Sequence, residues 1–410
     1  MNITLKSIIF KNTVWLALGE GISKILMFFL FVYAARIFGP EDFGIFNFAL
    51  AFASLFLIFS NFGISEITTR ELSKDKGEIK NYPAILLLKI LLSLIVFVII
   101  IIVSFLVIYD INIRKIIWIL GIYILAHNFL MIVYSFYRAQ RKMQFEALIK
   151  IVESFLIFIF GFFILFKYPL VINFSLVLLI VSLIMAVFFI IFFSLIIRSV
   201  WRSWNFKFWQ DFLKISWPLG LAYAFSMVYI SIDSVMMGLW GQIIEVGWYS
   251  AAYKIAGALI IPSTLISASF FPVLTKLFNE SKEEFQRVFK FYLKLSVVLS
   301  LIILFFGLIF SSYIVNIVYG LDFIPAVLAL QILIVMVSLS YVYVPFFTVL
   351  IVSNNQRKIL VLSFVGAIIN IILNIILIPL YSLYGASLAT LITYLVILIL
   401  AIIFYRKIIN

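Results

Sequence analysis

The stretch RIFGPEDFGIFNFALAF, residues 36–52, places charged residues, two glycines and a proline between two long apolar runs. A related stretch, MMGLWGQIIEVGWYSAAYKIA, occupies residues 236–256. Residues 44–49 align with residues 247–252 at an offset of 203 residues, and Gly39 aligns with Gly241 after one extra residue in the second copy. A weaker similarity relates residues 139–158 to residues 355–374. Because the offset is close to half the chain, the sequence predicts two halves in parallel orientation.

The composition indicates an all-α integral membrane protein. The chain has 410 residues, of which 66% are hydrophobic and only 11% are charged, whereas about a quarter of the residues in a soluble domain are charged. Apolar runs of about 18 residues or more, enough for a helix to cross a bilayer, recur along the chain. We attribute the net charge of +13 to basic cytoplasmic loops facing anionic lipid, and not to a nucleic-acid surface.

Several kinds of chemistry are excluded by missing residues and motifs. The sequence has no cysteine and one histidine, His127, which excludes disulfides, a thiol nucleophile and a histidine-based metal cluster. It contains no Walker A motif, no G-x-S-x-G and no H-E-x-x-H, so ATP hydrolysis and the common hydrolase mechanisms are not expected. We therefore expect a transporter without a catalytic site or cofactor, leaving H⁺ or Na⁺ as a possible coupling ion.

Hydropathy predicts twelve spans, six in each half. We place them at residues 12–37, 42–63, 82–109, 115–138, 146–166, 170–197, 212–239, 245–275, 285–318, 323–350, 358–380 and 383–405. The loops on one side hold 21 basic residues and those on the other hold 4, namely Arg36, Arg114, Lys115 and Lys167. The positive-inside rule then places both termini in the cytoplasm.

Two cytoplasmic segments are expected to lie at the membrane interface. Residues 64–81 carry charges of both signs and suit an interfacial helix. Residues 198–214 carry Trp201, Trp204 and Trp209 among basic residues, which suits a segment joining the two halves. This segment divides the chain into an N-terminal lobe, residues 1–200, and a C-terminal lobe, residues 201–410.

The opening stretch itself is interpreted mainly as a turn between the first two spans. Gly39 and Pro40 end the first span, Glu41 and Asp42 supply acidic residues to the first turn of the second, and Gly44 permits close helix packing. Arg36 lies one turn inside the first span, which leaves it open to a functional role.

Polar residues within the spans are the candidate site residues, because ionisable groups in a membrane are costly and usually functional. The first half contributes Glu20, Lys24, Lys89, Lys150 and Glu153, and the second half contributes Asp233, Lys254, Asn370 and Asn374. Together they suggest a central cleft for an anionic group such as a phosphate or pyrophosphate.

Each candidate also has a structural interpretation that the sequence leaves open. Lys89 and Lys150 could snorkel to the cytoplasmic interface. Asp233 could snorkel outward or pair with Lys254, and Glu20 with Lys24 could form only an ion pair that staples helices. The two asparagines are more typical of interhelical packing, and His127 is more typical of a neutral, hydrogen-bonded histidine than of a proton relay.

Four segments resemble the polysaccharide biosynthesis flippases of the multidrug/oligosaccharidyl-lipid/polysaccharide (MOP) exporter superfamily. They are AARIFGPEDFGIFNFALAF (34–52), NFGISEITTRELSK (61–74), SIDSVMMG with EVGWYSAAYKIAGALIIPSTLISASFFPVLTKL (231–277) and GAIINIILNIILIPLYSLYGASLATLITY (366–394). They recur in the family's order over nearly the whole chain. The resemblance implies two six-helix lobes around a V-shaped cavity. The family often has charges at the places of Glu20, Lys24, Arg36, Arg70, Asp233 and Lys254.

The resemblance also implies a function. Such proteins move a polyprenyl-(pyro)phosphate-linked oligosaccharide across the cytoplasmic membrane by alternating access, and work beside glycosyltransferases and a polymerase. Lipid II flippases of the superfamily carry further spans beyond twelve, which favours the polysaccharide branch here. Two alternatives remain: a multidrug cation antiporter, which would need an acid-rich, cation-poor cavity, and a membrane glycosyl polymerase, for which we would expect a large external loop.

Overall fold

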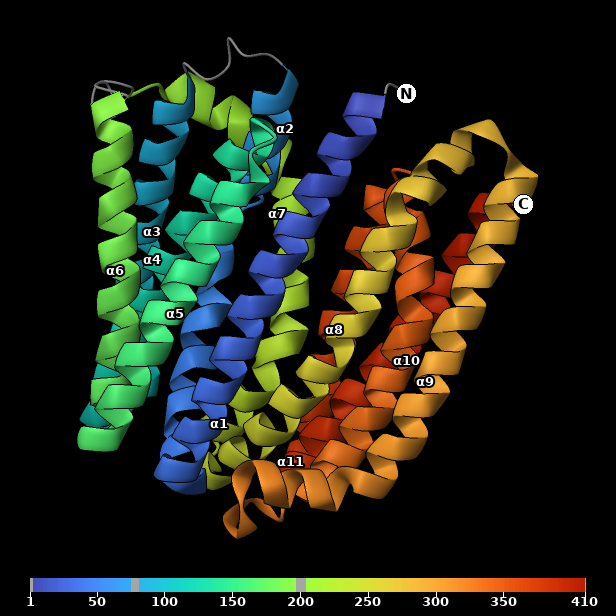
Figure 1. The fold of residues 1–410 in the computed structure, drawn as a ribbon. Helices are drawn as coiled ribbons and strands as arrows, with labels where there is room; N and C mark the ends of the chain where they lie inside the picture. Colours follow the sequence, from blue (N-terminus) through green and yellow to red (C-terminus); the bar gives the residue numbers. More distant parts are fainter. Residues whose placement is uncertain (1–2, 75–80, 197–203, 410) are drawn as a thin grey trace. The chain divides into compact units, whose positions relative to one another are not determined.

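The computed structural model describes residues 3–74, 81–196 and 204–409, and within these residues all regular structure is helical (Figure 1). The helices of the first half are α1 (Ile3–Asn61), α2 (Ile64–Lys74), α3 (Tyr82–Val107), α4 (Ile111–Ala139), α5 (Met143–Lys167) and α6 (Val171–Ile196). Those of the second half are α7 (Phe206–Leu239), α8 (Ile243–Glu280), α9 (Lys282–Tyr319), the short 3₁₀ helix η3 (Leu321–Phe323), α10 (Ala326–Val352) and α11 (Gln356–Ile409).

Two of these helices are long enough to cross a membrane twice. The apolar part of α1, Val14–Leu57, has 44 residues, about 66 Å of helix against a hydrocarbon core of about 30 Å. The backbone breaks at Gly39 (φ 68°) in α1 and at Ser382 (φ 51°) in α11. The ten candidate membrane helices of the described residues therefore contain twelve crossing segments, which confirms the predicted all-α membrane fold of twelve spans.

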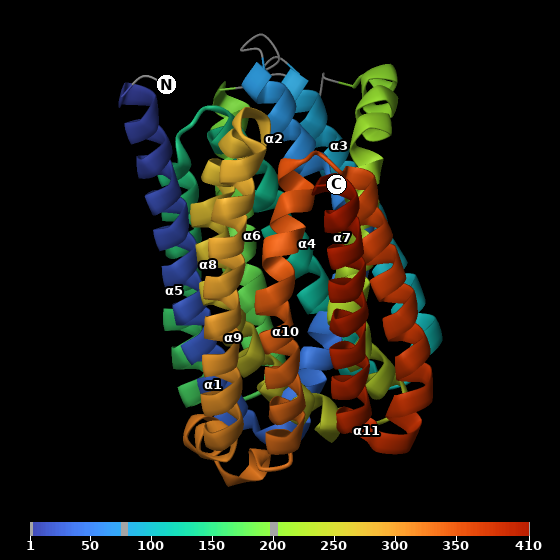
Figure 2. The same cartoon turned by 90° about the vertical axis from the view of Figure 1, so that its right-hand side faces the viewer.

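The chain forms two compact units. The first comprises Met1–Phe38 with Ala49–Ala224, and the second comprises Gly39–Phe48 with Phe225–Asn410. In the first unit α4 packs against α2, α3, α5 and α6. In the second unit α10 packs against α8, α9 and α11 (Figure 2). The predicted lobe limits, residues 1–200 and 201–410, and the predicted V-shaped cavity stay predictions.

The two copies of the repeated turn pack against each other inside the second unit. A methyl group added at Gly44 would overlap the carbonyl oxygen of Ile243, and one added at Gly247 would overlap the carbonyl oxygen of Pro40. Pro40 and Ile243 are separated by the same 203 residues as the two glycines, so the contact is reciprocal, like an isologous interface. This geometry confirms that Gly44 serves close helix packing.

The two predicted interfacial segments become helices that pack on the first unit. The helix α2 covers part of residues 64–81, and its Ile64, Ile67 and Leu72 join a buried core. Residues 75–80 lie outside the described residues, as do 198–203 of the second segment, including Trp201. Trp209 at the start of α7 is buried, and its Nε1 donates to the carbonyl oxygen of Ala84 at 2.8 Å.

Candidate functional site

A polar cavity of about 280 Å³ opens in the first unit between α1, α4 and α5. Four of the residues predicted from the sequence line it: Glu20, Lys24, Lys150 and Glu153. The rest of the lining consists of Ser23, Met27, Phe31, Tyr123, His127, Met131, Ser154 and Ile157. The structure therefore brings together charged residues from the first and fifth spans that lie 130 residues apart in sequence.

Close packing of α1 on α5 places these charges within bonding distance. A Cβ atom at Gly19 would lie 2.7 Å from the Cα of Ala147, so glycine is needed at this crossing. On the same two helices, Lys150 Nζ lies 2.5 Å from Glu20 Oε1. The ion pair is therefore positioned by the small residue that precedes Glu20, which ties helix packing to the charge arrangement of the cavity.

The ion pair belongs to a longer row of alternating charges. Lys150 Nζ lies 2.8 Å from Glu146 Oε1, one turn along α5. Arg138 holds both oxygens of Glu146, with Nε 2.7 Å from Oε2 and Nη2 2.5 Å from Oε1. At the other end Lys24 Nζ is 3.7 Å from Glu20 Oε2. The row thus runs from Arg138 at the end of α4, through the buried Glu146, to Lys24 in the first span.

Lys24 is the most accessible cation of the row. Its side chain is 53% exposed, against 11% for Lys150. Its neighbour Glu20 is already engaged by Lys150 at a shorter distance. In such a row the acids are largely neutralised, and an exposed ammonium at the end can still bind a further anion. The alternative in which Glu20 and Lys24 only staple two helices does not explain this exposure.

The remaining acid of the cavity, Glu153, is buried and hydrogen-bonded. Its Oε1 accepts from Ser182 Oγ at 2.8 Å and lies 3.1 Å from His127 Nδ1. His127 is thus hydrogen-bonded, as its sequence context suggested, and it lines the cavity. Glu153 and His127 therefore form a polar part of the cavity wall in which Glu153 has no need of a lysine partner.

Three other predicted cations lie away from this cavity. Lys89 is fully buried on α3, where its Nζ donates to Asn61 Oδ1 at 3.0 Å, so it does not snorkel to the interface. Arg36 on α1 and Arg70 on α2 are exposed, and Arg70 Nε donates to Glu71 Oε1 at 2.9 Å. None of the three lines the polar cavity, and their roles stay predictions.

In the second unit, Asp233 is the centre of a sealed hydrogen-bond network. Its carboxylate accepts from Tyr249 Oη at 2.5 Å, Thr390 Oγ1 at 2.6 Å and Asn374 Nδ2 at 2.5 Å. Asn374 also donates to Asn370 Oδ1 at 3.1 Å. The predicted Asp233, Asn370 and Asn374 are therefore brought together.

The predicted lysine of the second unit makes an aromatic contact. Lys254 on α8 is half-buried, and its Nζ lies 5.8 Å from the centre of the Phe43 ring, within cation–π distance. Phe43 belongs to the repeated stretch that opens the second span. Asp233, by contrast, is held by uncharged donors, so the sequence-based option of an Asp233–Lys254 pair is not needed to satisfy the carboxylate.

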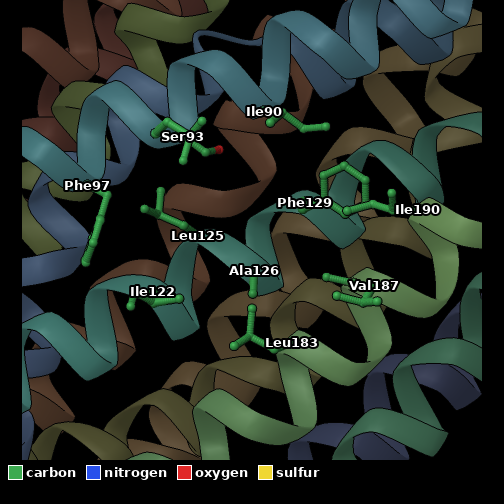
Figure 3. Close-up of a pocket in the computed structure, with 12 residues that line it drawn as sticks. Ile90, Ser93, Phe97, Ile122, Leu125, Ala126, Phe129, Leu183, Val187 and Ile190 are labelled. Atoms are coloured by element: carbon green, nitrogen blue, oxygen red, sulfur yellow. The ribbon is translucent and has the colours of Figure 1, made fainter. Parts of the chain in front are cut away.

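A second cavity of the first unit, of about 340 Å³, is hydrocarbon-lined and cannot serve a charged ligand (Figure 3). It lies among α3, α4 and α6, and Figure 3 shows Phe97, Leu125, Phe129 and Val187 around it. Its one polar lining residue is Ser93. Because an ionised headgroup would lose its hydration there without gaining partners, the charged cavity remains the candidate site.

Sequence reasoning overlooked several residues that complete these networks. In the sequence, Arg138 is one of the 21 basic residues on the cytoplasmic side, and Glu146 lies at the predicted start of the fifth span. Glu146 and Lys150 are spaced i, i+4, which is the spacing of a helical ion pair, so this signal was present. Tyr249 and Thr390, which hold Asp233, gave no such signal because they lie 16 and 157 residues away from it.

Comparisons with known proteins agree with the fold. A family model described as "Polysaccharide biosynthesis protein" matches residues 9–278. No curated protein sequence matches the chain. The structure of the lipid II flippase MurJ in an inward closed conformation superposes with a TM-score of 0.78 at 18% identity, covering 95% of this chain and 86% of that one.

Two further solved structures show the same fold. An inward-facing MATE-family multidrug resistance transporter of the MOP superfamily gives a TM-score of 0.68 at 16% identity, covering 97% of this chain and 94% of that one. A MOP superfamily transporter from Pyrococcus furiosus gives a TM-score of 0.61 at 17% identity, covering 98% and 96%. At these identities the similarity establishes the architecture.

Proposed function

The chain belongs to the family of polysaccharide biosynthesis proteins, and from this premise we propose that it is a flippase for lipid-linked oligosaccharides. The substrate is a polyprenyl-(pyro)phosphate-linked repeat unit of the O-antigen, capsule or exopolysaccharide type. The protein moves it from the inner to the outer leaflet of the cytoplasmic membrane by alternating access, as a transporter and not an enzyme. Glycosyltransferases that build the repeat unit and a polymerase that consumes it are the expected partners.

The single observation that carries this proposal is the charge arrangement of the polar cavity. Its acids are engaged by Lys150, His127 and Ser182, while Lys24 is more than half exposed at the end of the row. An ammonium in this position suits the pyrophosphate of the substrate. The polar cavity wall suits the first part of the glycan, and the prenyl chain remains in the surrounding lipid.

A multidrug cation antiporter is the second candidate, and the same cavity argues against it. Such a protein needs carboxylates that are available to an organic cation. Glu20 and Glu153 line the cavity, but both are already engaged. Glu20 Oε1 lies 2.5 Å from Lys150 Nζ, and Glu153 is hydrogen-bonded to Ser182 and His127. Lys24 and Lys150 line the cavity as well and do not turn away from it, so an organic cation would meet the exposed ammonium of Lys24.

The orientation proposed from the loop charges places both termini in the cytoplasm. In that orientation Arg138 and Glu146 lie toward the cytoplasmic end of their spans and Lys24 lies deeper. A headgroup arriving from the inner leaflet would then pass the neutralised part of the row before it reaches the exposed ammonium. This order of groups supports entry from the cytoplasmic side.

The test of the proposal is export in cells that lack their own copy of the gene and carry Lys24→Gln, Lys24→Arg or wild type. Because one charge-assisted contact to phosphate is worth roughly 1.4 kcal/mol, Lys24→Gln should reduce exported polysaccharide about tenfold. Lys24→Arg keeps the charge and should retain most of the export. Lipid-linked intermediate should accumulate inside the Lys24→Gln cells.

The matched control is Lys276→Gln. Lys276 also forms an i, i+4 pair with a glutamate, Glu280, at 3.5 Å, and its side chain is 70% exposed, but it lies outside the cavity. Its export should equal that of wild type. Undiminished export by Lys24→Gln, with equal amounts of protein in the membrane, would contradict the role of this cation.

A further inference from the structure

A seam of polar and aromatic side chains runs through the interior of the second unit. It receives Ser226, Tyr229 and Asp233 from one face of α7, at spacings of three and four residues. The helix α8 adds Tyr249 and Tyr253, α10 adds Tyr343, and the two parts of α11 add Asn370 with Asn374 and Thr390 with Tyr394. Four helices thus direct polar groups to one region of an otherwise hydrocarbon core.

One end of the seam is sealed. Asp233, Asn370 and Asn374 are 0% exposed, and Tyr249 and Thr390 are each 1% exposed. The carboxylate of Asp233 is occupied by three donors within 2.6 Å. The carboxylate at this end therefore has its hydrogen-bonding requirements met within the protein, whereas Asn370 Nδ2 and Asn374 Oδ1 are buried without a partner. The role of this end is to fix the positions of the helices that carry the seam.

The other end is partly open and consists of four tyrosines, Tyr229, Tyr253, Tyr343 and Tyr394, which we name the tyrosine cluster. All four are only partly buried. The rings of Tyr229 and Tyr394 meet edge to face with centres 6.1 Å apart. The ring of Tyr253 lies 5.8 Å from that of Tyr249, which shares the Asp233 carboxylate with Thr390, one helical turn before Tyr394. The helix α10, which carries Tyr343, packs against both α8 and α11, so the cluster draws on four helices.

Three hydroxyls of the tyrosine cluster remain available to a ligand. In the described residues, those of Tyr253, Tyr343 and Tyr394 have no hydrogen-bonding partner, and none of them is among the buried unpartnered atoms, which include the hydroxyl of Tyr319. A tyrosine combines a flat apolar ring with a hydroxyl that both donates and accepts. Four of them at one place offer stacking surfaces and hydrogen bonds without formal charge.

We propose that the tyrosine cluster binds the saccharide part of the substrate, an inference that rests on the proposed flippase function. A sugar ring presents apolar C–H faces and a rim of hydroxyls, which match aromatic rings and phenolic hydroxyls. A phosphate would need cations, and a prenyl chain would leave the hydroxyls without partners. An organic cation could stack on the rings, but the carboxylate of Asp233, which would attract it, is buried and held by three donors.

The test measures binding to the purified full-length protein in lipid nanodiscs. One probe is polyprenyl pyrophosphate, and the other is the same carrier bearing the oligosaccharide, extracted from the organism that makes the protein. Wild type should bind the glycosylated carrier about tenfold more tightly, the effect of two or three hydrogen bonds. The double variant Tyr253→Phe/Tyr394→Phe should lose that difference and bind the bare carrier as wild type does.

The control variant is Tyr319→Phe, which removes a buried hydroxyl without a partner at the end of α9. It should keep the tenfold preference, and equal unfolding temperatures of the three proteins show that all are folded. If the double variant keeps the preference for the glycosylated carrier, the saccharide assignment is overturned. It is also overturned if tetraphenylphosphonium, an organic cation, competes for binding to wild type and this competition is lost in the double variant. If wild type binds neither carrier, the flippase proposal itself fails, which is a different result.

Discussion

Glu146→Gln is expected to destabilise the protein by about 3 kcal/mol, the loss typical when one partner of a buried ion pair is removed. The side chain of Glu146 is 0% exposed and is held by Arg138 through two contacts and by Lys150 through a third. Glutamine has the same shape but no charge. In the variant, Arg138 and Lys150 face a neutral amide. Each of them keeps its desolvation cost but loses its attraction to the carboxylate.

The measurement is the unfolding temperature in detergent, with Glu280→Gln as control. Glu280 pairs with Lys276 at 3.5 Å, but both side chains are more than half exposed, so its loss should change the stability by less than about 1 kcal/mol. The triple variant Arg138→Met/Glu146→Leu/Lys150→Met should recover much of the stability, since an apolar set of similar volume avoids the desolvation cost. Equal unfolding temperatures for Glu146→Gln and wild type would contradict the buried charge row.

Asp233→Ala is expected to destabilise the second unit by about 2 kcal/mol or more, because it leaves buried donors without an acceptor. Tyr249, Thr390 and Asn374 all donate to this carboxylate and are at most 1% exposed. Thr390→Val removes one donor together with its requirement for an acceptor. The double variant Asp233→Ala/Thr390→Val should therefore lose less stability than the two single variants added together.

The control for this series is Asp211→Ala, an exposed position in the first turns of α7. Asp211 is 59% exposed and lies 3.7 Å from Lys214, so the substitution should shift the unfolding temperature by little. Strict additivity of Asp233→Ala and Thr390→Val would show that the two side chains do not share a hydrogen bond. That result would contradict the network at the sealed end of the seam.

The membrane fold was predictable from the sequence because its signals are local. Runs of apolar residues fix the spans, and the Gly39–Pro40 pair marks the break in α1. The break in α11 falls at Ser382, between the predicted limits 380 and 383, although serine seldom adopts a positive φ. The repeat at an offset of 203 residues is also a structural contact, because Gly44 and Gly247 each pack against the other copy.

The candidate site was predictable only in part because its partners are distant in sequence. Spacing along one helix suggested the pair of Glu20 and Lys24. It could not show that Lys150 bonds Glu20 across 130 residues, or that Lys89 is satisfied by Asn61 and so leaves the list of cavity cations. A hydropathy pattern shows that a charged residue lies within a span. The partners of that residue depend on how the helices pack.

The tyrosine cluster illustrates the same limit for uncharged residues. Tyrosines are common in membrane helices, and nothing in their local sequence distinguishes Tyr394 from Tyr319. The structure separates them, because the ring of Tyr394 meets that of Tyr229 from another helix, whereas Tyr319 has a buried hydroxyl without a partner. A convergence of this kind depends on how four helices pack, which no single stretch of sequence encodes.

Translocation by the purified protein in sealed vesicles tests the flippase proposal most directly. The lipid-linked oligosaccharide of the source organism is incorporated, and a glycosidase added outside reports how much glycan is exposed over time. Vesicles with wild type should expose the inner pool steadily, and vesicles with Lys24→Gln about tenfold more slowly. An inner pool that stays as protected with wild type as in protein-free vesicles would contradict the account.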